Sequence, residues 1–137
     1  MMIVKLYTDG ASRGNPGPSG IGVLAKDETG ELIFQHYKYI GTGTNNQAEY
    51  IALIEGLKKL MEFYTPEEID LTVNADSQLM VRQLNGEYKI KNKKLAELKS
   101  KIDRLIGSFK NVKFVHIPRE LNKEADKLAN KALNSVE

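Results

Sequence analysis

The stretch IVKLYTDGASRGNPGPSG, residues 3–20, indicates the class of fold more clearly than any other part of this chain. Residues 3–9 form a short apolar run of the kind that favours a strand, and this predicted strand ends at Asp9. Residues 10–19 are dominated by Gly, Pro and Ser, which predicts a turn. Because an acid that closes an apolar strand before a glycine-rich turn is poorly explained by solvation alone, Asp9 is a candidate functional residue.

Strands and helices alternate along the rest of the chain. Residues 20–27 and 31–40 predict two more strands, which complete an antiparallel meander with the first. The further predicted elements are helices over 45–63, 77–85, 93–107 and 121–134 and strands over 69–75 and 111–117. This order predicts an α/β fold in which helices flank a five-stranded mixed sheet, antiparallel at first and then parallel. Ligands of such sheets gather at the carboxyl ends of parallel strands, where Asp9 and Asp76 are both expected.

Length and composition exclude several classes of protein. A chain of 137 residues predicts one domain, spanning residues 1–137, with a core of its own. The absence of cysteine excludes disulfides, zinc fingers and thiol nucleophiles. No apolar run approaches a membrane span and the N-terminus lacks the shape of a signal peptide, so we expect a soluble cytoplasmic protein with no membrane partner. The net charge of only +2 means that a phosphate-binding surface has to be local.

Four acidic residues lie in four separate motifs along the chain. They are Asp9 in TDGASRGNPGPSG, Glu49 in TNNQAEY, Asp76 in NADSQL and Asp126 in NKEADKLA. Carboxylates brought within a few ångströms repel one another, so a cluster of four is rarely built without a cation. Oxygen-only ligation predicts Mg²⁺ or Mn²⁺ rather than zinc, and phosphoester chemistry.

Each of these acids also has a simpler explanation when it is taken alone. Asp76 could cap the helix that follows it, Glu49 could be a solvated residue at the edge of a buried stripe, and Asp126 could flank the apolar face of the last helix. Neighbouring amides favour a binding site instead. Asn122 precedes Asp126 by four residues, which predicts that both project from one helical face. Asn45 and Asn46 begin the helix of Glu49, and amides beside acids suit the recognition of sugars and bases.

The ordered motifs DG-x-x-x-GNPG-x-x-G, TNN-x-AE, DS-x-x and N-x-x-AD resemble type 1 ribonuclease H, from residue 3 to about residue 133. The resemblance implies a single catalytic domain of the ribonuclease H-like fold, monomeric, which cleaves the RNA strand of RNA/DNA hybrids and leaves 5′-phosphate and 3′-hydroxyl ends. It also implies two Mg²⁺ ions, with Mn²⁺ as a possible substitute, held by an Asp-Glu-Asp-Asp set. That set falls on Asp9, Glu49, Asp76 and Asp126.

The resemblance also assigns roles to residues. Asp9 would bridge both ions, Asp76 would hold the ion on the nucleophile side, and Glu49 would lie by the leaving-group ion and accept a hydrogen bond from a 2′-hydroxyl. The substrate contacts that it implies, together with the amide beside Asp126, are Gly10, Asn15, Thr44, Asn45, Asn46, Gln78, Asn92 and Asn122. Of these, Thr44 and Asn92 would face a phosphate of the DNA strand. Asn15 could equally be a turn residue and Gln78 a solvated helix residue.

Two departures from the family pattern affect the interpretation. Many relatives carry a loop with a catalytic histidine before the last acid. His116 can be counted into that register from Asp126, but alignment on Pro118 instead shortens the loop and loses the histidine. His116 is then a strand residue, and Arg119 becomes the candidate for a contact near the leaving group. Arginine can stabilise charge there but cannot act as a base. The basic, aromatic-rich protrusion of several relatives is also missing, and in its place is a modest basic run over residues 89–94.

Two alternative functions remain open at this point. A catalytically idle module that binds RNA/DNA hybrids would account for the missing histidine loop, although four carboxylates oppose the binding of RNA. An exonuclease of related fold is the other alternative, but its FD-x-E signature is absent from the first strand, which ends TDGA.

Overall fold

The computed structural model describes residues 1–136, and residue 137, the last of the predicted domain, lies outside the described residues. The strands are β1 (Met2–Ser12), β2 (Gly17–Asp27), β3 (Leu32–Gly43), β4 (Ile69–Ala75) and β5 (Asn111–His116). The α-helices are α1 (Asn45–Phe63), α2 (Gln78–Leu84), α3 (Lys93–Ile106) and α4 (Lys123–Asn134). Two short 3₁₀ helices, η1 (Pro66–Glu68) and η2 (Arg119–Leu121), precede β4 and α4.

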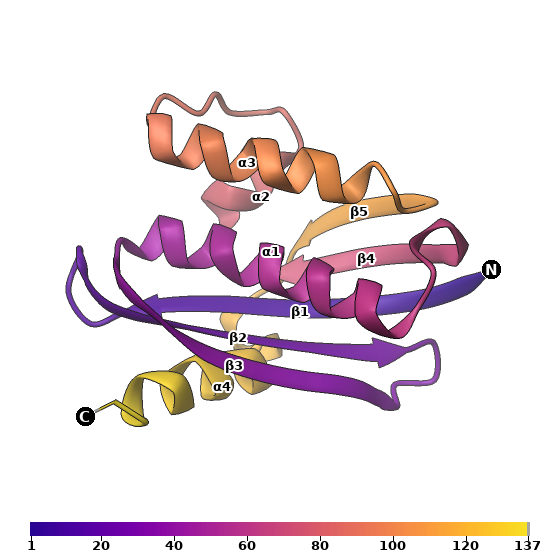
Figure 1. Cartoon of the computed structure of the whole chain (residues 1–137), viewed down its shortest axis with the longest axis horizontal. Coiled ribbons are helices and arrows are strands. Elements are labelled where there is room, and N and C mark those ends of the chain that lie inside the picture. Colours follow the sequence, from indigo (N-terminus) through magenta and orange to yellow (C-terminus); the bar gives the residue numbers. More distant parts are fainter. Residues whose placement is uncertain (137) are drawn as a thin grey trace.

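The five strands form one sheet in the order β3-β2-β1-β4-β5 (Figure 1). The meander β1 to β3 is antiparallel, whereas β4 lies parallel to both β1 and β5. The predicted α/β fold with a five-stranded mixed sheet is therefore confirmed. The central strand β1 has an antiparallel neighbour on one side and a parallel neighbour on the other.

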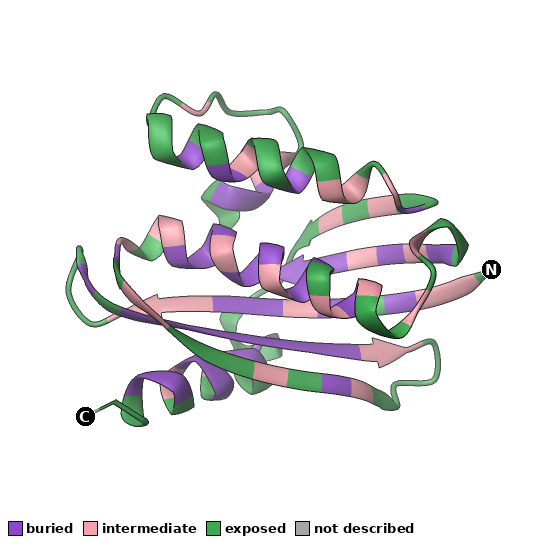
Figure 2. Cartoon of the chain, viewed as in Figure 1, coloured by how far each residue is buried: buried purple, intermediate pink, exposed green. Residues whose placement is uncertain are grey.

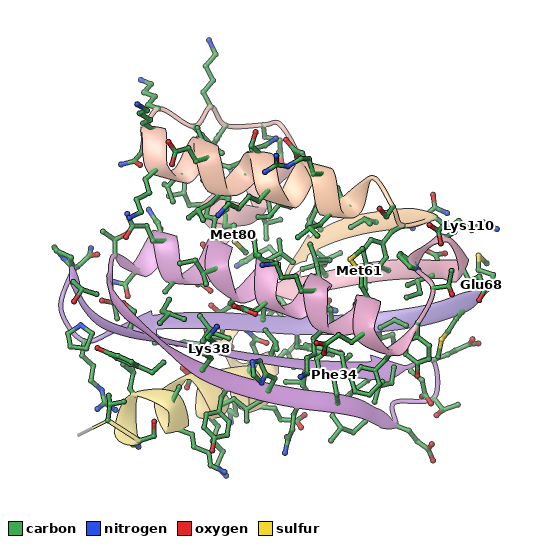
Figure 3. The ribbon with its side chains drawn as sticks, in the orientation of Figure 1. Phe34, Lys38, Met61, Glu68, Met80 and Lys110 are labelled. Carbon is green, nitrogen blue, oxygen red and sulfur yellow. The ribbon has the colours of Figure 1, made fainter. Side chains whose placement is uncertain are left out.

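Helices cover both faces of the sheet. Figure 1 shows α1 and α3 on one face and α4 on the other. The main core lies under α1, and the buried residues coloured in Figure 2 run along its inner face and the central strands. In the view of Figure 3, Met80 of α2 and Phe34 of β3 lie on opposite sides of α1, and both belong to this core. A second, smaller cluster of Leu24, Ala125 and Leu128 lies under α4.

Helix α1 begins and ends where the sequence predicts. Thr44 is its N-cap, and Thr44 and Gln47 form a capping box in which each side chain accepts a hydrogen bond from the backbone of the other. The helix ends at Phe63, and its apolar residues recur at helical spacing, so that Tyr50 and Leu53 are fully buried. Within residues 1–136, no helix is both long enough and apolar enough to cross a membrane.

The predicted turn over residues 10–19 is wrong in extent. Strand β1 continues through Asp9 to Ser12, and β2 already begins at Gly17, so that Asp9 pairs with Gly22 inside the antiparallel ladder. The glycines here serve close packing more than turn formation. A Cβ on Gly22 would lie 2.3 Å from the backbone oxygen of Ala125, because α4 rests directly on β2 at this point.

Gly10 has the same function on the opposite face of the sheet. A Cβ on Gly10 would lie 2.2 Å from the backbone carbon of Ala48 and 2.5 Å from the backbone nitrogen of Glu49. The first turns of α1 therefore lie against bare strand backbone. Glycines in β1 and β2 thus bring two helices, which carry Glu49 and Asp126, close to the central strand.

Candidate active site

Three carboxylates from distant parts of the chain meet at one end of the central strands. Asp9 comes from β1, Glu49 from the first turns of α1, and Asp76 from the residue after β4. One oxygen from each carboxylate lies within 4.8 Å of the other two. Asp9 is only 6% exposed and Glu49 only 8% exposed, so the group is partly shielded from water.

The end of strand β4 explains why polar side chains gather here. The parallel pairing of β1 with β4 stops at Thr8 and Ala75, so β1 continues without a strand on that side. Glu49 Oε1 accepts a hydrogen bond from the Gly10 backbone N–H at 2.9 Å, and Asn122 Nδ2 donates to the Thr8 carbonyl oxygen at 2.9 Å. Side chains from α1 and from the start of α4 therefore satisfy backbone groups that β4 leaves without a ladder partner.

Asp126 lies beside the three carboxylates but does not belong to their closest group. It is half-buried on the first turn of α4, and Asn130 Nδ2 donates to its carbonyl oxygen at 3.0 Å and to its Oδ1 at 3.3 Å. Its carboxyl group nevertheless contributes to the raised pKa of Asp9, both through a hydrogen bond and through its charge. The structure thus brings all four predicted acids into one neighbourhood, three of them within ligand distance of a shared cation.

Burial and mutual repulsion make it costly to ionise these acids together. Burial, followed by the charges of Glu49 and Asp76, raises the pKa of Asp9 to about 9. Burial and the charge of Asp76 raise the pKa of Glu49 to about 8, opposed by the Gly10 N–H and by the positive charge of Arg119. A hard divalent cation removes this cost, and carboxylate oxygens are the ligands that Mg²⁺ and Mn²⁺ prefer. The donor set therefore fits such an ion.

Comparison with known proteins agrees with this arrangement. Residues 7–132 match the family model described as Reverse transcriptase-like. A ribonuclease H of Pseudomonas entomophila is 34% identical over an alignment 153 positions long, gaps included. The alignment covers 97% of this chain and 95% of that protein. The chain belongs to the ribonuclease H family. It is also 38% identical over 133 residues to ribonuclease HI of Halobacterium salinarum, but it spans only 65% of the length of that relative.

A solved structure of the type 1 ribonuclease H family superposes closely on this chain. LC11-RNase H1, in complex with an RNA/DNA hybrid, is 44% identical, with a TM-score of 0.93. The match covers 97% of this chain and 98% of that one. The resemblance to type 1 ribonuclease H that the four motifs predicted is therefore confirmed.

In this ribonuclease H fold, several predicted substrate contacts are neighbours at the start of α1. Asn15 Oδ1 accepts a hydrogen bond from the Asn45 backbone N–H, and Asn45 Oδ1 accepts one from the Ser12 backbone N–H, both at 3.1 Å. Asn15 and Asn45 are exposed and Asn46 is half-buried. The loop between β1 and β2 is therefore fastened to α1 on the exposed side of the carboxylates.

Other predicted contacts have structural roles of their own. Thr44 caps α1 and Asn92 caps α3, where its Oδ1 accepts a hydrogen bond from Leu95 N–H at 3.0 Å. Gln78 is the exposed first residue of α2. The cap of α2 is Ser77, so the simpler explanation of Asp76 as a helix cap is wrong.

Asn122 lies just before the helix of Asp126 instead of within it, although both residues reach the acids of the site. Helix α4 begins at Lys123, and Asn122 is the residue before it, preceded by η2. Asn122 is only 1% exposed, and its Nδ2 donates to Asp76 Oδ2 at 2.9 Å as well as to Thr8. Its side chain therefore contacts an acid of the site and is itself almost fully buried.

The structure of this ribonuclease H shows a short connection between β5 and η2, where many relatives carry the histidine loop. His116 is the exposed last residue of β5, and the chain passes through Ile117 and Pro118 directly into η2. Arg119 is exposed, and its charge lowers the pKa of Glu49, which places it on the Glu49 side of the group. Sequence reasoning missed Asn130, although its spacing of four residues from Asp126 on one helix is a usable signal.

The raised pKa values predict how the metal-free protein responds to pH. An acid whose pKa is higher in the folded state than in the unfolded state stabilises the fold at low pH and loses that contribution as pH rises through its folded pKa. For Asp9 and Glu49 the loss falls between about pH 4 and about pH 9. We expect the free energy of unfolding in EDTA to decrease over this range, and Mg²⁺ to flatten the decrease. Urea denaturation at several pH values measures both, and a metal-free stability that rises with pH contradicts the prediction.

Proposed function

We propose that the chain is a metal-dependent endonuclease, folded as a single catalytic domain, that hydrolyses the RNA strand of RNA/DNA hybrids. The observation that carries the proposal is the group of Asp9, Glu49 and Asp76, whose oxygens lie within 4.8 Å of one another in a member of the ribonuclease H family. The structural neighbour LC11-RNase H1 is itself known in complex with an RNA/DNA hybrid.

Asp9, Glu49, Asp76 and Asp126 would hold two Mg²⁺ ions, for which Mn²⁺ can substitute. Bound in pairs, such ions lower the pKa of an attacking water and stabilise the charge on the phosphate and on the departing oxygen. Hydrolysis by this route leaves 5′-phosphate and 3′-hydroxyl ends. Raised pKa values at Asp9 and Glu49 support the proposal, because these buried acids repel one another when they are ionised and a cation would relieve this repulsion.

The chain orients these groups with its own backbone and side chains. The Gly10 N–H holds one oxygen of Glu49 at 2.9 Å, which fixes the rotamer of a side chain that approaches from a different element. Arg119 lies near Glu49, so its guanidinium could stabilise negative charge on the leaving side of the phosphate. Because arginine stays protonated, a water has to donate the proton to the leaving oxygen.

Recognition of the hybrid would involve the exposed amides around the start of α1. Asn15, Asn45, Asn46 and the Gly10 backbone would reach 2′-hydroxyls across the shallow minor groove of the hybrid, with Gln78 on the α2 side. The two helix caps Thr44 and Asn92 would face a DNA phosphate, and helix N-termini favour an anion there. The hydrogen bonds among Asn15, Asn45 and Ser12 support this assignment, because they preorganise the amides before the hybrid binds.

Cleavage of a 5′-labelled RNA/DNA hybrid tests the proposal. The hybrid is incubated with Mg²⁺, with Mn²⁺ and with EDTA, next to an all-DNA duplex of the same sequence. We expect internal cuts in the RNA strand that leave 3′-hydroxyl ends, and no cuts in EDTA or on DNA. Measurable hybrid binding without any cutting would support the idle module instead, and stepwise loss from one end would support an exonuclease.

The position of His116 predicts a small contribution to activity. Because it ends β5 on the exposed surface and carries no loop toward the carboxylates, we expect His116→Ala to change kcat by less than about 3-fold, well below the 10²–10⁴-fold of a general acid or base. Arg119→Ala, which removes the charge near Glu49, is the matched comparison and should lower kcat more. A loss of 10²-fold or more in His116→Ala without loss of stability would show that the histidine is catalytic.

A further inference from the structure

Asn122 occupies the junction of three elements that carry the acids. Its carbonyl oxygen accepts the Asp126 N–H at 3.1 Å, which begins α4. Its Nδ2 donates to the Thr8 carbonyl oxygen, next to Asp9 on β1, and to Oδ2 of Asp76 after β4, each at 2.9 Å. One asparagine is therefore bonded to, or adjacent to, three of the four acids.

The side chain of Asn122 does not perform the function that its position favours. An asparagine at a helix N-cap normally accepts a hydrogen bond from the first turn of the helix, but this side chain makes no capping bond. Its Oδ1 is buried and has no hydrogen-bond partner among the described residues. The missing capping bond and the unpaired, buried Oδ1 each destabilise the fold. Where a local rule is broken at a buried residue, a functional constraint is the usual reason.

The orientation of the amide follows from its partners. The Thr8 carbonyl and the Asp76 carboxylate can only accept hydrogen bonds, so the amide nitrogen has to face both, and Oδ1 has to face away. The two bonds need the two hydrogens of one NH₂ group. Aspartate or serine at this position cannot make the pair, although both are good N-caps.

We propose that Asn122 is a positioning residue that fixes the Asp76 carboxylate, relative to Asp9 on β1 and Asp126 on α4, for binding of a divalent cation. The proposal rests on the proposed function, since it takes these acids as the cation ligands. Asp76 follows the last ladder pair of β4 and is half-buried, so its carboxylate needs a partner to hold one rotamer. Asn122 bonds to Oδ2, so Oδ1 would remain available to a cation held together with Asp9 and Glu49.

Two variants of Asn122 separate positioning from helix capping. Asn122→Ala removes the amide and offers no capping group, whereas Asn122→Ser removes the amide and offers a side chain that can cap α4. Asn74→Ala is the matched control, because Asn74 is another buried asparagine whose Nδ2 donates to a β1 carbonyl, that of Leu6 at 3.4 Å, instead of a carboxylate. The measurements are the Mn²⁺ dissociation constant by calorimetry, the Mg²⁺ concentration for half-maximal cleavage, the KM for hybrid and the melting temperature.

We expect both Asn122 variants to weaken Mn²⁺ binding by about 10- to 100-fold and to raise the Mg²⁺ requirement by a similar factor. The KM for hybrid at saturating Mg²⁺ should stay unchanged, and Asn74→Ala should lower only the melting temperature. Wild-type Mn²⁺ affinity in Asn122→Ser would overturn the proposal. Equal weakening in Asn74→Ala would overturn it too, as a general effect of lost stability.

The Mn²⁺ titration still tests the role of Asn122 if one variant does not fold or if the wild-type protein does not cleave the hybrid. If Asn122→Ala does not fold, the capped variant Asn122→Ser carries the comparison. If the wild-type protein binds Mn²⁺ but cuts no hybrid, the proposed nuclease function fails, whereas the Mn²⁺ titration of the variants still decides whether Asn122 positions Asp76.

Discussion

Replacing Asp9 with asparagine is expected to abolish cleavage of the hybrid and, at the same time, to make the metal-free protein more stable. Asp9 is the most central of the acids, since it lies in β1 between the side chains from α1 and α4. Loss of a group that acts together with others in catalysis costs about 10³-fold or more in kcat. Labelled-hybrid cleavage with Mg²⁺ and with Mn²⁺ measures this loss.

The gain in stability has a separate physical cause. Burial and three neighbouring acids raise the pKa of Asp9 to about 9, so its ionised form is disfavoured in the metal-free fold. Asn has the same shape without the charge, and we expect the free energy of unfolding in EDTA at pH 8 to rise by about 1–3 kcal/mol. The stabilisation of the wild-type protein by Mg²⁺ should largely vanish in the variant.

A matched control separates the site from a general effect of charge. Asp103→Asn removes an exposed acid of α3 that is paired with Lys99, far along the chain from the four motifs. It should leave cleavage unchanged and stability nearly so, because exposed ion pairs of this kind contribute about 0.3–0.5 kcal/mol. Unimpaired turnover in Asp9→Asn would overturn the assignment of the site, and a stability loss at pH 8 would contradict the account of its electrostatics.

Gly22→Ala is expected to destabilise the fold strongly and to lower activity, although it adds only one methyl group. The new Cβ would lie 2.3 Å from the Ala125 carbonyl oxygen and 2.6 Å from the Ala129 nitrogen, both backbone atoms of α4. Since backbone cannot swing aside as a side chain does, α4 has to move away from β2. We expect a loss of about 3 kcal/mol in the free energy of unfolding.

Displacement of α4 also moves Asp126, the residue after Ala125. A misplacement of about 1 Å in a catalytic arrangement can cost about 10²-fold, so kcat should fall even where the variant is fully folded. Gly107→Ala is the control, because its added Cβ would meet only ordinary contacts of 3.4 Å or more at the end of α3. A Gly22→Ala protein with wild-type stability would show that α4 is less firmly seated than the structure indicates.

The sequence is most informative where its patterns report on one element at a time. Helix α1 and strand β4 match their predicted bounds because helical spacing of apolar residues and a short β-branched run are local signals. The four acids were found because each lies in a motif with its own spacing. Their convergence around Asp9 depends on the strand order, of which the sequence predicts only a mixed sheet, antiparallel at first and then parallel.

The remaining features depend on contacts between elements that local patterns do not record. The glycines within residues 10–19 were predicted to be turn residues, but Gly10 lies in β1, with the first turns of α1 packed against it, and Gly17 already belongs to β2. Asn122 fits the pattern of the last helix, yet its partners Thr8 and Asp76 lie 114 and 46 residues away in sequence. No periodicity within a window of residues could reveal a bond of that kind.

Catalytic competence in this chain is a property of the finished tertiary structure. Asp9 lies within β1 and Asp76 directly after β4, whereas Glu49 and Asp126 lie on two helices that pack on opposite faces of the sheet. Asp126 belongs to α4, whose backbone packs directly against the backbone of β2 at Gly22. A copy in which α4 has not packed on β2 therefore lacks Asp126 at the site. We expect such a partly folded copy to be inactive, so that packing of α4 contributes to folding and to activity at once.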